Sequence, residues 1–569
     1  MQKYKSYIIA VGLIASCSGI SSCKKNFAEI NTNPSVVTIP DIKFLLTYAE
    51  DRIVTYQYNE WIWESMEQLF RFTQHLTTDP YEMTNNVNSR YGTYYLQALP
   101  NLFEIRKQIA AKADKDNYKK MEAVTYILQA LHGIKVTDMN GSIPYSQATQ
   151  GRYEGNFNPV YDKQEELFAK WLQELDNAIA VLSDNSLPNQ NTYGGSDVFY
   201  KSDWVKWTKL ANSLKLRIAS RLDIANNAKT REIFQQVMQN ATGPIENDDD
   251  QLSYQNVDYL AFGTGGEINY RSTRFATTSI IKFLKTSNDP RLPIYFEPND
   301  LQGKYQDTLT KYAASLPSFI TPGDPLIRYQ GGPADFTTNP SVATYIKNAF
   351  AVGNTNPGNA ISRYFLISPI NRKFFSPRYN STSGDFKDVI VTAAENCFLI
   401  AEFIQKGYAG SVNTRGSAED WYKRGIISSI KTMNSIAIAA GSATGFSGSG
   451  DTEIDAYLAN AAVKFNGVND LERIYIQEYL NFYRNANEAF VFIRRTGYPK
   501  KVSTYYAREP FNEPIPRRFW TTDPGEANRV NWQAAMADQG FTPNAQDLPT
   551  LSTQRIWYDK TAPNFGEGN

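Results

Sequence analysis

Amphipathic helical periodicity is the feature that most constrains the fold of this chain. In the segment 204–222, apolar side chains recur every three or four residues, and Lys and Arg residues fall largely between them. This spacing puts the apolar side chains on one face of a helix and the cations on its flank. The same periodicity predicts helices at 43–71, 91–113, 118–137, 168–182, 231–240, 278–286, 393–406, 418–433 and 470–494. We therefore expect a mostly α-helical protein.

The early helices are grouped in pairs along the chain. Two long helices are expected before Asp114, two flank the loop 138–159, and two follow Tyr200. Helix pairs that recur every ~30 to 45 residues are typical of tetratricopeptide-like repeats. The strict tetratricopeptide consensus is absent, so the periodicity predicts a helical-repeat scaffold of this general type.

The region 244–387 differs from the helical parts of the chain. Gly, Pro, Asn, Ser and Thr dominate it, and 278–286 is its main predicted helix. Loops held by a rigid scaffold are where binding function usually lies. We expect a loop-rich lobe on a helical frame, with short strands and helices inside it.

The N-terminus has the pattern of an export signal. Lys3 and Lys5 precede the apolar stretch 7–14, which is typical of a secretory signal peptide and too short for a membrane-spanning helix. The signal ends in ISSC at Cys23, which resembles the lipobox of bacterial lipoproteins, whose cysteine carries two acyl chains and anchors the protein stably. The string IASC at Cys17 also fits, but Cys23 leaves the apolar stretch complete. An ordinary signal peptide that contains two cysteines is the alternative.

The composition narrows the partners and the chemistry. Lys plus Arg and Asp plus Glu both number 58, so a neutral chain has no overall field to attract nucleic acid. Tyr leads the aromatic residues, with 36 copies, and its polar tip suits contact surfaces that stay wet. Beyond the signal region only Cys397 remains, in an apolar run, so we expect a buried thiol and no disulfide framework.

Motifs for enzymatic chemistry are scarce. The only histidines, His75 and His132, lie far apart and form no H-E-x-x-H, and neither G-x-S-x-G nor a P-loop is present. The acidic stretch Glu246, Asp248, Asp249 and Asp250 lacks EF-hand spacing; we expect a solvated loop, with adventitious calcium as the alternative, and no cofactor. A glycosidase needs only two carboxylates across a cleft, so the sequence leaves that class open.

A series of short strings runs in order along the chain. They are FAEINTNP at 27–34, DMNGSIPYSQA at 138–148, PVYD at 159–162, KW at 206–207, ANSLKLR at 211–217 with Arg221, DPRL at 289–292, AE at 394–395 and 401–402 with KG at 406–407, NEAF at 487–490, RRTGYP at 494–499 and PRR at 516–518 with Glu526. Together they resemble the SusD/RagB family of outer-membrane nutrient-binding lipoproteins, in its SusD-like branch.

This resemblance implies a fold, a location and a function. The fold would be mostly α-helical, with tetratricopeptide-like pairs forming a curved wall and an irregular lobe upon it. The protein would sit on the cell surface, anchored to the outer membrane by its lipid. It would bind a ligand, commonly a glycan, and pass it to a SusC-type TonB-dependent transporter without acting as an enzyme.

The resemblance also separates structural from ligand-binding residues. We expect Asn212, Arg217, Arg221, Arg494 and Arg495, which lie in the matching strings, to hold helix ends and lobe contacts. Ligand contacts are expected in variable loops. The candidates are Tyr81, Asn85, Asn86, Arg90 and Tyr91 after the first long helix, and Tyr259, Phe262, Tyr270 and Arg271 in the middle lobe.

The sequence thus predicts one composite domain with several regions. These are a signal peptide (1–22), a lipid-anchored segment (23–42), a helical-repeat region (43–243), a loop-rich ligand-facing lobe (244–392), and C-terminal helices with a closing segment (393–569). The leading function is glycan capture. A receptor for peptides or another nutrient, and a lipid-anchored glycoside hydrolase, are the alternatives.

Overall fold

The computed structural model describes most of the chain downstream of the signal region. The described residues are 39–54, 59–78, 87–254, 274–299, 324–335, 367–375 and 388–568, without 443 and 447. Within these ranges, no helix combines the length and the apolar character needed to cross a membrane.

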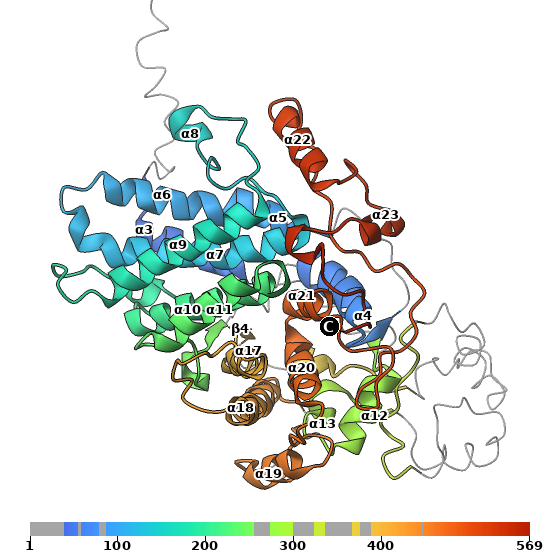
Figure 1. Ribbon diagram of the computed structural model, residues 1–569. Coiled ribbons are helices and arrows are strands. Elements are labelled where there is room, and N and C mark those ends of the chain that lie inside the picture. Colours follow the sequence, from blue (N-terminus) through green and yellow to red (C-terminus); the bar gives the residue numbers. More distant parts are fainter. Residues whose placement is uncertain are drawn as a thin grey trace, which may run out of the picture.

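Layered helices from the first half of the chain form one wall of the molecule. Figure 1 shows α6, α7, α9 and α10 stacked side by side at the left, and each packs against its neighbour in that series or against α3 or α11. The bounds of these helices are Ile42–Ile53 (α3), Leu99–Ala110 (α6), Lys119–Asn140 (α7), Gln164–Ser183 (α9), Trp204–Ala225 (α10) and Asn227–Gln239 (α11). The predicted mostly α-helical, tetratricopeptide-like scaffold is confirmed.

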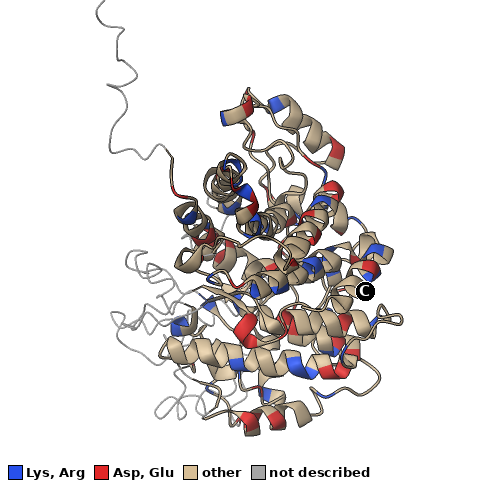
Figure 2. Cartoon of the chain, turned by 90° about the vertical axis from the view of Figure 1, so that its left-hand side faces the viewer, with Lys and Arg blue, Asp and Glu red and all other residues tan. Residues whose placement is uncertain are grey.

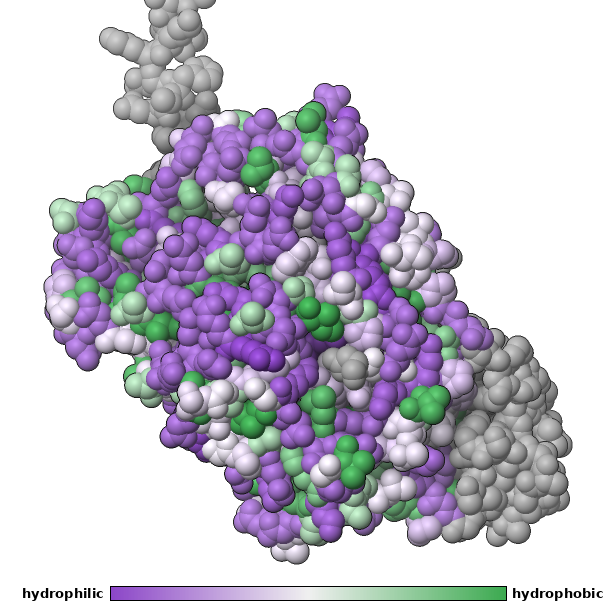
Figure 3. Space-filling model, viewed as in Figure 1, coloured by the Kyte–Doolittle hydropathy of each residue, from purple (hydrophilic) through white to green (hydrophobic). Residues whose placement is uncertain are grey.

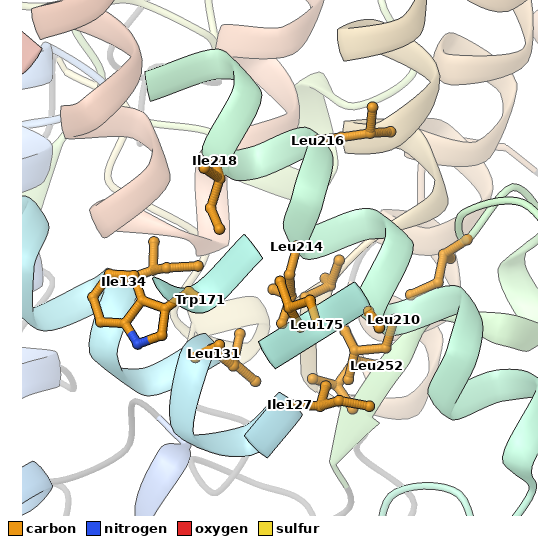
Figure 4. Close-up of a cluster of buried hydrophobic side chains, with 14 of the residues drawn as sticks. Ile127, Leu131, Ile134, Trp171, Leu175, Leu210, Leu214, Leu216, Ile218 and Leu252 are labelled. Carbon is orange, nitrogen blue, oxygen red and sulfur yellow. The ribbon is translucent and has the colours of Figure 1, made fainter. Parts of the chain in front are cut away.

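Helix α10 lies at the centre of this wall. Asp203 caps its N-terminus by accepting hydrogen bonds from the amides of Val205 and Lys206. Almost every residue from Trp207 to Asp223 is buried, so both sides of the helix pack on other elements. Figure 4 shows side chains of α7, α9 and α10 meeting in one apolar cluster together with Leu252.

A second group of helices comes from the C-terminal half. Helix α17 (Ala393–Gln405) packs against α18 (Ala418–Ala439) and α20 (Asp470–Asn481), and α21 (Ala486–Thr496) packs on the segment that ends in α4 (Phe70–Thr73). Thr392 caps α17 through the amide of Glu395. Cys397 is buried in α17, as expected, and burial raises the pKa of its thiol to about 12.

Two small antiparallel sheets join distant parts of the chain. Strand β1 (Thr77–Thr78) pairs with β3 (Arg274–Phe275), and β2 (Leu252–Tyr254) pairs with β4 (Asp388–Val391) with an irregularity between Leu252 and Ser253. The short helices α12 (Thr278–Thr286), α13 (Leu292–Tyr295) and α16 (Arg372–Phe375) come between β3 and β4 along the chain. Helix α12 has the predicted bounds.

The remaining elements are short or lie at the edges of the molecule. They are the π-helices η2 (Asn59–Leu69) and η3 (Tyr94–Ala98); the helices α5 (Ser89–Thr93), α8 (Gly151–Glu154), α19 (Asp451–Ala459), α22 (Arg529–Gln539) and α23 (Leu548–Thr553); and the 3-10 turns η4 (Lys115–Tyr118), η5 (Gly194–Ser196), η6 (Asp248–Asp250), η11 (Phe482–Arg484) and η12 (Trp557–Asp559).

The predicted single helix 470–494 is wrong. The chain forms α20, a 3-10 turn and then α21, because Asn485 leaves helical geometry and its side chain caps α21 through the amide of Glu488. Likewise, the predicted single helix 43–71 is wrong, because α3 ends at Ile53 and a π-helix occupies 59–69.

Candidate functional site

The ends of two segments that carry predicted ligand residues meet at the sheet of β1 and β3. Thr78 is the register partner of Arg274. The chain leaves Thr78 into 79–86 and returns from 255–273 at Arg274. We name the surroundings of this strand pair the loop junction: Glu67, residues 77–78, 274–277 and 332–335, and Glu509.

A buried ion pair fixes the loop junction. The Arg274 guanidinium binds the Glu67 carboxylate, and the Thr78 hydroxyl donates to the other oxygen of Glu67 at 3.4 Å. All three residues are buried. A carboxylate paired in the interior is sensitive to the loss of either partner, so these contacts tie β1, β3 and η2 together.

A third segment reaches the loop junction from 324–335. The Thr77 hydroxyl donates to the carbonyl of Ala334 at 3.0 Å, and Thr277 bridges Gly332 in parallel. The Glu509 carboxylate accepts from the amides of Ser279 and Ala334, at 2.9 and 3.0 Å. Glu509, from the C-terminal part of the chain, therefore holds both the start of α12 and the segment 324–335 in place.

A hollow of about 570 Å³ adjoins the loop junction, since Glu509 belongs to both. Its wall comes from 501–517 and from 552–565, near the C-terminal end of the chain, which lies between α21 and α4 in Figure 1. Phe511 and Phe565 supply aromatic rings, and Asn512 and Asn564 supply exposed amides. The volume is within the range of small-molecule sites.

Most of the predicted ligand residues lie outside the described residues. They are Tyr81, Asn85 and Asn86 in the first segment, and Tyr259, Phe262, Tyr270 and Arg271 in the second. Their ligand role stays a prediction. The structure adds that the described residues flanking the two segments, Thr78 and Arg274, are paired.

Arg90, one of the predicted ligand residues, is buried and has partners inside the protein. Arg90 lies in α5 with its side chain 1% exposed, bound to Glu64 and Asn487, and its Nη1 also donates to the carbonyl of Lys135 at 3.2 Å. Its hydrogen-bonding capacity is directed into the interior, where it joins α5 to η2 and α21.

Tyr91 is half-buried rather than fully exposed. Its ring centroid lies 4.7 Å from that of Tyr95. Burial, together with Tyr161 nearby, raises the pKa of the Tyr91 phenol well above its ordinary value. Its role as a ligand contact stays a prediction.

The arginines of the recognisable strings hold the scaffold, as predicted. Arg221 on α10 donates to Asp138 at the end of α7 and to Glu488 on α21, at 2.9 and 2.7 Å. Arg217 binds Glu395 and the carbonyl of Ile390. Four elements thus meet around buried, paired charges.

Two further arginines of these strings also bind partners inside the scaffold, one through backbone carbonyls and one through carboxylates. Arg494 donates to the carbonyls of Asp138 and Arg517, at 2.6 and 2.8 Å. Arg495 binds Glu402 and Glu478, at 2.8 and 3.0 Å.

On the face in Figure 2, residues of the two signs are interspersed over the helices. The face in Figure 3 likewise mixes hydrophilic and hydrophobic residues.

The acidic stretch near β2 is engaged by neighbouring side chains. Glu246 pairs with Arg415 at 2.5 Å and Arg424 at 3.4 Å, and Asp250 pairs with Lys209 at 2.6 Å. In the described part of the chain, no group of three or more His, Cys, Asp and Glu side chains is arranged to hold a metal ion. The calcium alternative gains no support from these contacts.

The two histidines have structural surroundings. His75 is fully buried beyond α4, between the Thr73 hydroxyl at 2.8 Å and the Tyr479 carbonyl at 2.7 Å, and burial lowers its pKa to about 3. His132 is buried in α7 near Tyr94. Neither is placed for acid–base chemistry at neutral pH.

Sequence reasoning missed the hollow and its lining. The segment 508–513, REPFNE, combines a cation, an aromatic ring and an amide in a stretch without helical or strand periodicity. That composition is the only sequence signal for it. The partner segment at 564–565 lies too far along the chain for a local pattern to connect the two.

The comparisons with known proteins bear on the whole scaffold. A family model described as SusD-like, starch-binding and associating with the outer membrane matches residues 32–520. This chain belongs to the SusD-like family. The matched residues include the helical wall, the loop junction and α21. The regions that form the core of this SusD-like protein are therefore the regions that it shares with the family.

Solved structures share the fold of this SusD-like protein. A chitin-binding protein aligns with a TM-score of 0.66 at 21% identity, covering 92% of this chain and 100% of its own. A chitin-binding SusD homologue from Flavobacterium johnsoniae gives 0.63 at 18% identity, with the same coverage of both chains. A SusD homologue from Bacteroides fragilis gives 0.64 at 21%, covering 92% and 99%. No curated protein matches the chain.

Proposed function

We propose that this SusD-like protein is a cell-surface lipoprotein that captures a glycan and delivers it to a SusC-type TonB-dependent transporter. Family membership supports a binding role at the outer membrane. The single structural observation that carries the proposal is the pairing of Thr78 with Arg274. Through this pair, the two segments that contain the predicted tyrosine and amide contacts start from one fixed point.

The chemistry of those segments suits a sugar. Aromatic rings can cover the C–H face of a pyranose, and amides and arginines can bind its hydroxyl groups. Tyr81 and Tyr270 supply the rings, and Asn85 and Arg271 supply the polar groups. Two fold relatives are described as chitin-binding, so oligosaccharides of N-acetylglucosamine head the list of ligands to test.

A ligand screen tests the proposal. The chain from Lys24 onward is mixed with a panel of polysaccharides and with peptides, and its melting temperature and affinity-gel mobility are measured. We expect stabilisation by one glycan class and no released sugar after long incubation. Stabilisation by peptides alone would favour the peptide receptor, and release of shortened sugars would favour the glycoside hydrolase.

The lipid anchor has a separate test with a matched control. Cys23 follows the apolar signal stretch and Cys17 lies inside the same region. In cells labelled with a fatty-acid analogue, we expect Cys23→Ala to abolish labelling and Cys17→Ala to retain it. Labelling that disappears only in Cys17→Ala would assign the anchor to Cys17.

Delivery to the transporter is tested in cells. The proposed partner is an outer-membrane transporter of the SusC type, and the cargo is the glycan found in the screen. Co-purification of the transporter with the tagged lipoprotein, and loss of glycan uptake on deletion, are the expected results. Uptake that continues unchanged without the lipoprotein would contradict the delivery role.

A further inference from the structure

The hollow at the C-terminal segment is lined by an excess of positive charge. Lys501, Arg508, Arg517 and Arg555 are its cations, and Glu509 and Glu513 are its carboxylates. The net formal charge of these six groups is therefore +2. Such a lining lowers the energy of a negatively charged ligand, particularly in a recess that restricts water.

Both carboxylates of the lining are already engaged elsewhere. Glu509 accepts hydrogen bonds from the amides of Ser279 and Ala334 at the loop junction. Glu513 binds the guanidinium of Arg71. Neither carboxylate forms an ion pair with Lys501, Arg508 or Arg555 among the described residues. Arg517 and Arg555 pair instead with the buried Asp559, at 2.9 and 3.9 Å, so Lys501 and Arg508 are the lining cations that have no ion pair in the described part of the chain.

Arg508 is the most informative of these cations. The residue is 5% exposed, and its Nη2 donates to the carbonyl of Phe72 at 2.7 Å. Its Nη1 has no hydrogen-bond partner, and no carboxylate lies within ion-pair distance of it, in the described part of the chain. A buried guanidinium without a counter-charge costs stability, which an arriving anion can offset.

Other buried arginines have more partners than Arg508. Among the described residues, Arg494 and Arg518 bind no carboxylate, but both terminal nitrogens of each donate to oxygen atoms. Arg221, Arg495 and Arg517 each bind at least one carboxylate. Burial lowers the pKa of Arg508 to about 10, so its guanidinium still carries a proton at neutral pH. Arg508 is therefore a retained positive charge at the wall of a hollow.

The aromatic rings of the hollow add a surface for a sugar ring. Phe511 is half-buried and meets the edge of Phe72 at a centroid distance of 6.3 Å. The Arg517 guanidinium covers one face of Phe565 at 3.9 Å. With the exposed amides of Asn512 and Asn564, the lining combines aromatic, amide and cationic groups.

We propose that this hollow binds a sugar that carries a negatively charged substituent, a carboxylate or a sulfate, with Arg508 as its buried cationic partner and Lys501 as a cation at the rim. The ring of the sugar lies against Phe511. This inference rests on the proposed function, because it names an acidic sugar as part of the captured glycan.

Calorimetric titration of the chain from Lys24 onward tests this inference. The ligands are an oligogalacturonate, a sulfated oligosaccharide and a neutral chito-oligosaccharide of equal length. We expect one anionic ligand to bind at least ~10-fold more tightly than the neutral one at low salt. We also expect this preference to shrink at high salt, because the rim charge is screened. The two anionic ligands distinguish a carboxylate from a sulfate.

Charge variants connect the preference to the hollow. Lys501→Glu reverses an exposed rim charge, and Lys464→Glu reverses an exposed charge on another surface. We expect Lys501→Glu to weaken anionic binding at least ~5-fold, with Lys464→Glu within ~2-fold of the parent chain. Arg508→Met should weaken it further; where that variant fails to fold, the rim pair and the salt series still decide.

The outcomes separate this inference from the proposed function. Tight binding of the neutral glycan with no anionic preference overturns the acidic-sugar inference and leaves glycan capture standing. Equal loss in Lys501→Glu and Lys464→Glu overturns the assignment to the hollow. No binding of any glycan overturns both the inference and the proposed function.

Discussion

Thr78 and Arg274 lie opposite each other on the two-residue strands β1 and β3. The Arg274 side chain and the Thr78 hydroxyl both bind Glu67 of η2. Each strand borders a segment with predicted ligand residues. One buried carboxylate therefore holds together the two strands that border these segments.

Arg274→Ala tests the role of the loop junction. We expect this variant to lose glycan affinity at least ~5-fold, because Glu67 and Thr78 lose their shared partner and the two segments lose a common anchor. Affinity is measured by calorimetry with the glycan found in the screen. Lys282→Ala, an exposed change on α12, is the control. Equal affinity in the two variants would show that the anchor does not position ligand contacts.

Arg221→Met tests the buried charge cluster. Removing this guanidinium leaves the carboxylates of Asp138 and Glu488 buried and poorly compensated, so the free energy of unfolding should fall by ~3 to 5 kcal/mol. Urea unfolding measures this change. Arg152→Met, whose side chain is largely exposed, should change stability by less than ~0.5 kcal/mol. A small effect at Arg221 would contradict the structural role assigned to it.

Two helical glycines give a matched test of core packing. A Cβ at Gly133 in α7 would lie 2.6 Å from Cζ2 of Trp171, whereas a Cβ at Gly92 in α5 meets nothing within 4 Å. Gly133→Ala should destabilise the protein by ~1 to 3 kcal/mol despite the better helix propensity of alanine. Gly92→Ala should stabilise it by up to ~1 kcal/mol. Similar thermal unfolding of the two variants would contradict this packing.

Glu478 gives a prediction for pH dependence. Burial raises its pKa from 4.5 to about 8, while Arg495 favours its charged form. Between pH 4.5 and 8 the folded state then holds a proton that the unfolded state has released, so stability falls as the pH rises through this window. In Glu478→Gln this loss should disappear.

Urea unfolding at pH 5 and pH 8 measures the Glu478 effect. The parent chain should lose more stability between the two values than Glu478→Gln does. Glu419→Gln, a change at an exposed position of α18, should follow the parent chain. Identical pH dependence in all three proteins would rule out a protonated Glu478 at neutral pH.

The helical scaffold could be predicted because its signals are local. Apolar spacing in 204–222 predicts α10, and 278–286 is found with the predicted bounds. The arginine strings also predict structural roles, since an arginine within an apolar helix face needs a buried partner. The break at Asn485 was missed because apolar periodicity continues across it. The local geometry is decided instead by the Asn485 side chain, which caps α21 by accepting a hydrogen bond from the amide of Glu488.

The site was harder to predict because it depends on tertiary pairing. Nothing in the sequence near Thr78 indicates that Arg274 lies opposite it. Arg90 has the composition of a loop contact, yet its partners Glu64 and Asn487 come from other elements and draw it into the interior. The missing counter-charge of Arg508 is equally a property of the packed structure.

The glycan affinity of the chain with Tyr81→Ala and Tyr270→Ala combined tests the proposed site most directly, with Tyr118→Ala as the control. We expect the parent chain and the control to bind one glycan class equally, and the double variant to bind it at least ~10-fold more weakly, a loss of ~1.4 kcal/mol. Unchanged affinity in the double variant would contradict the placement of the site, and a parent chain that binds no glycan would contradict the proposed function.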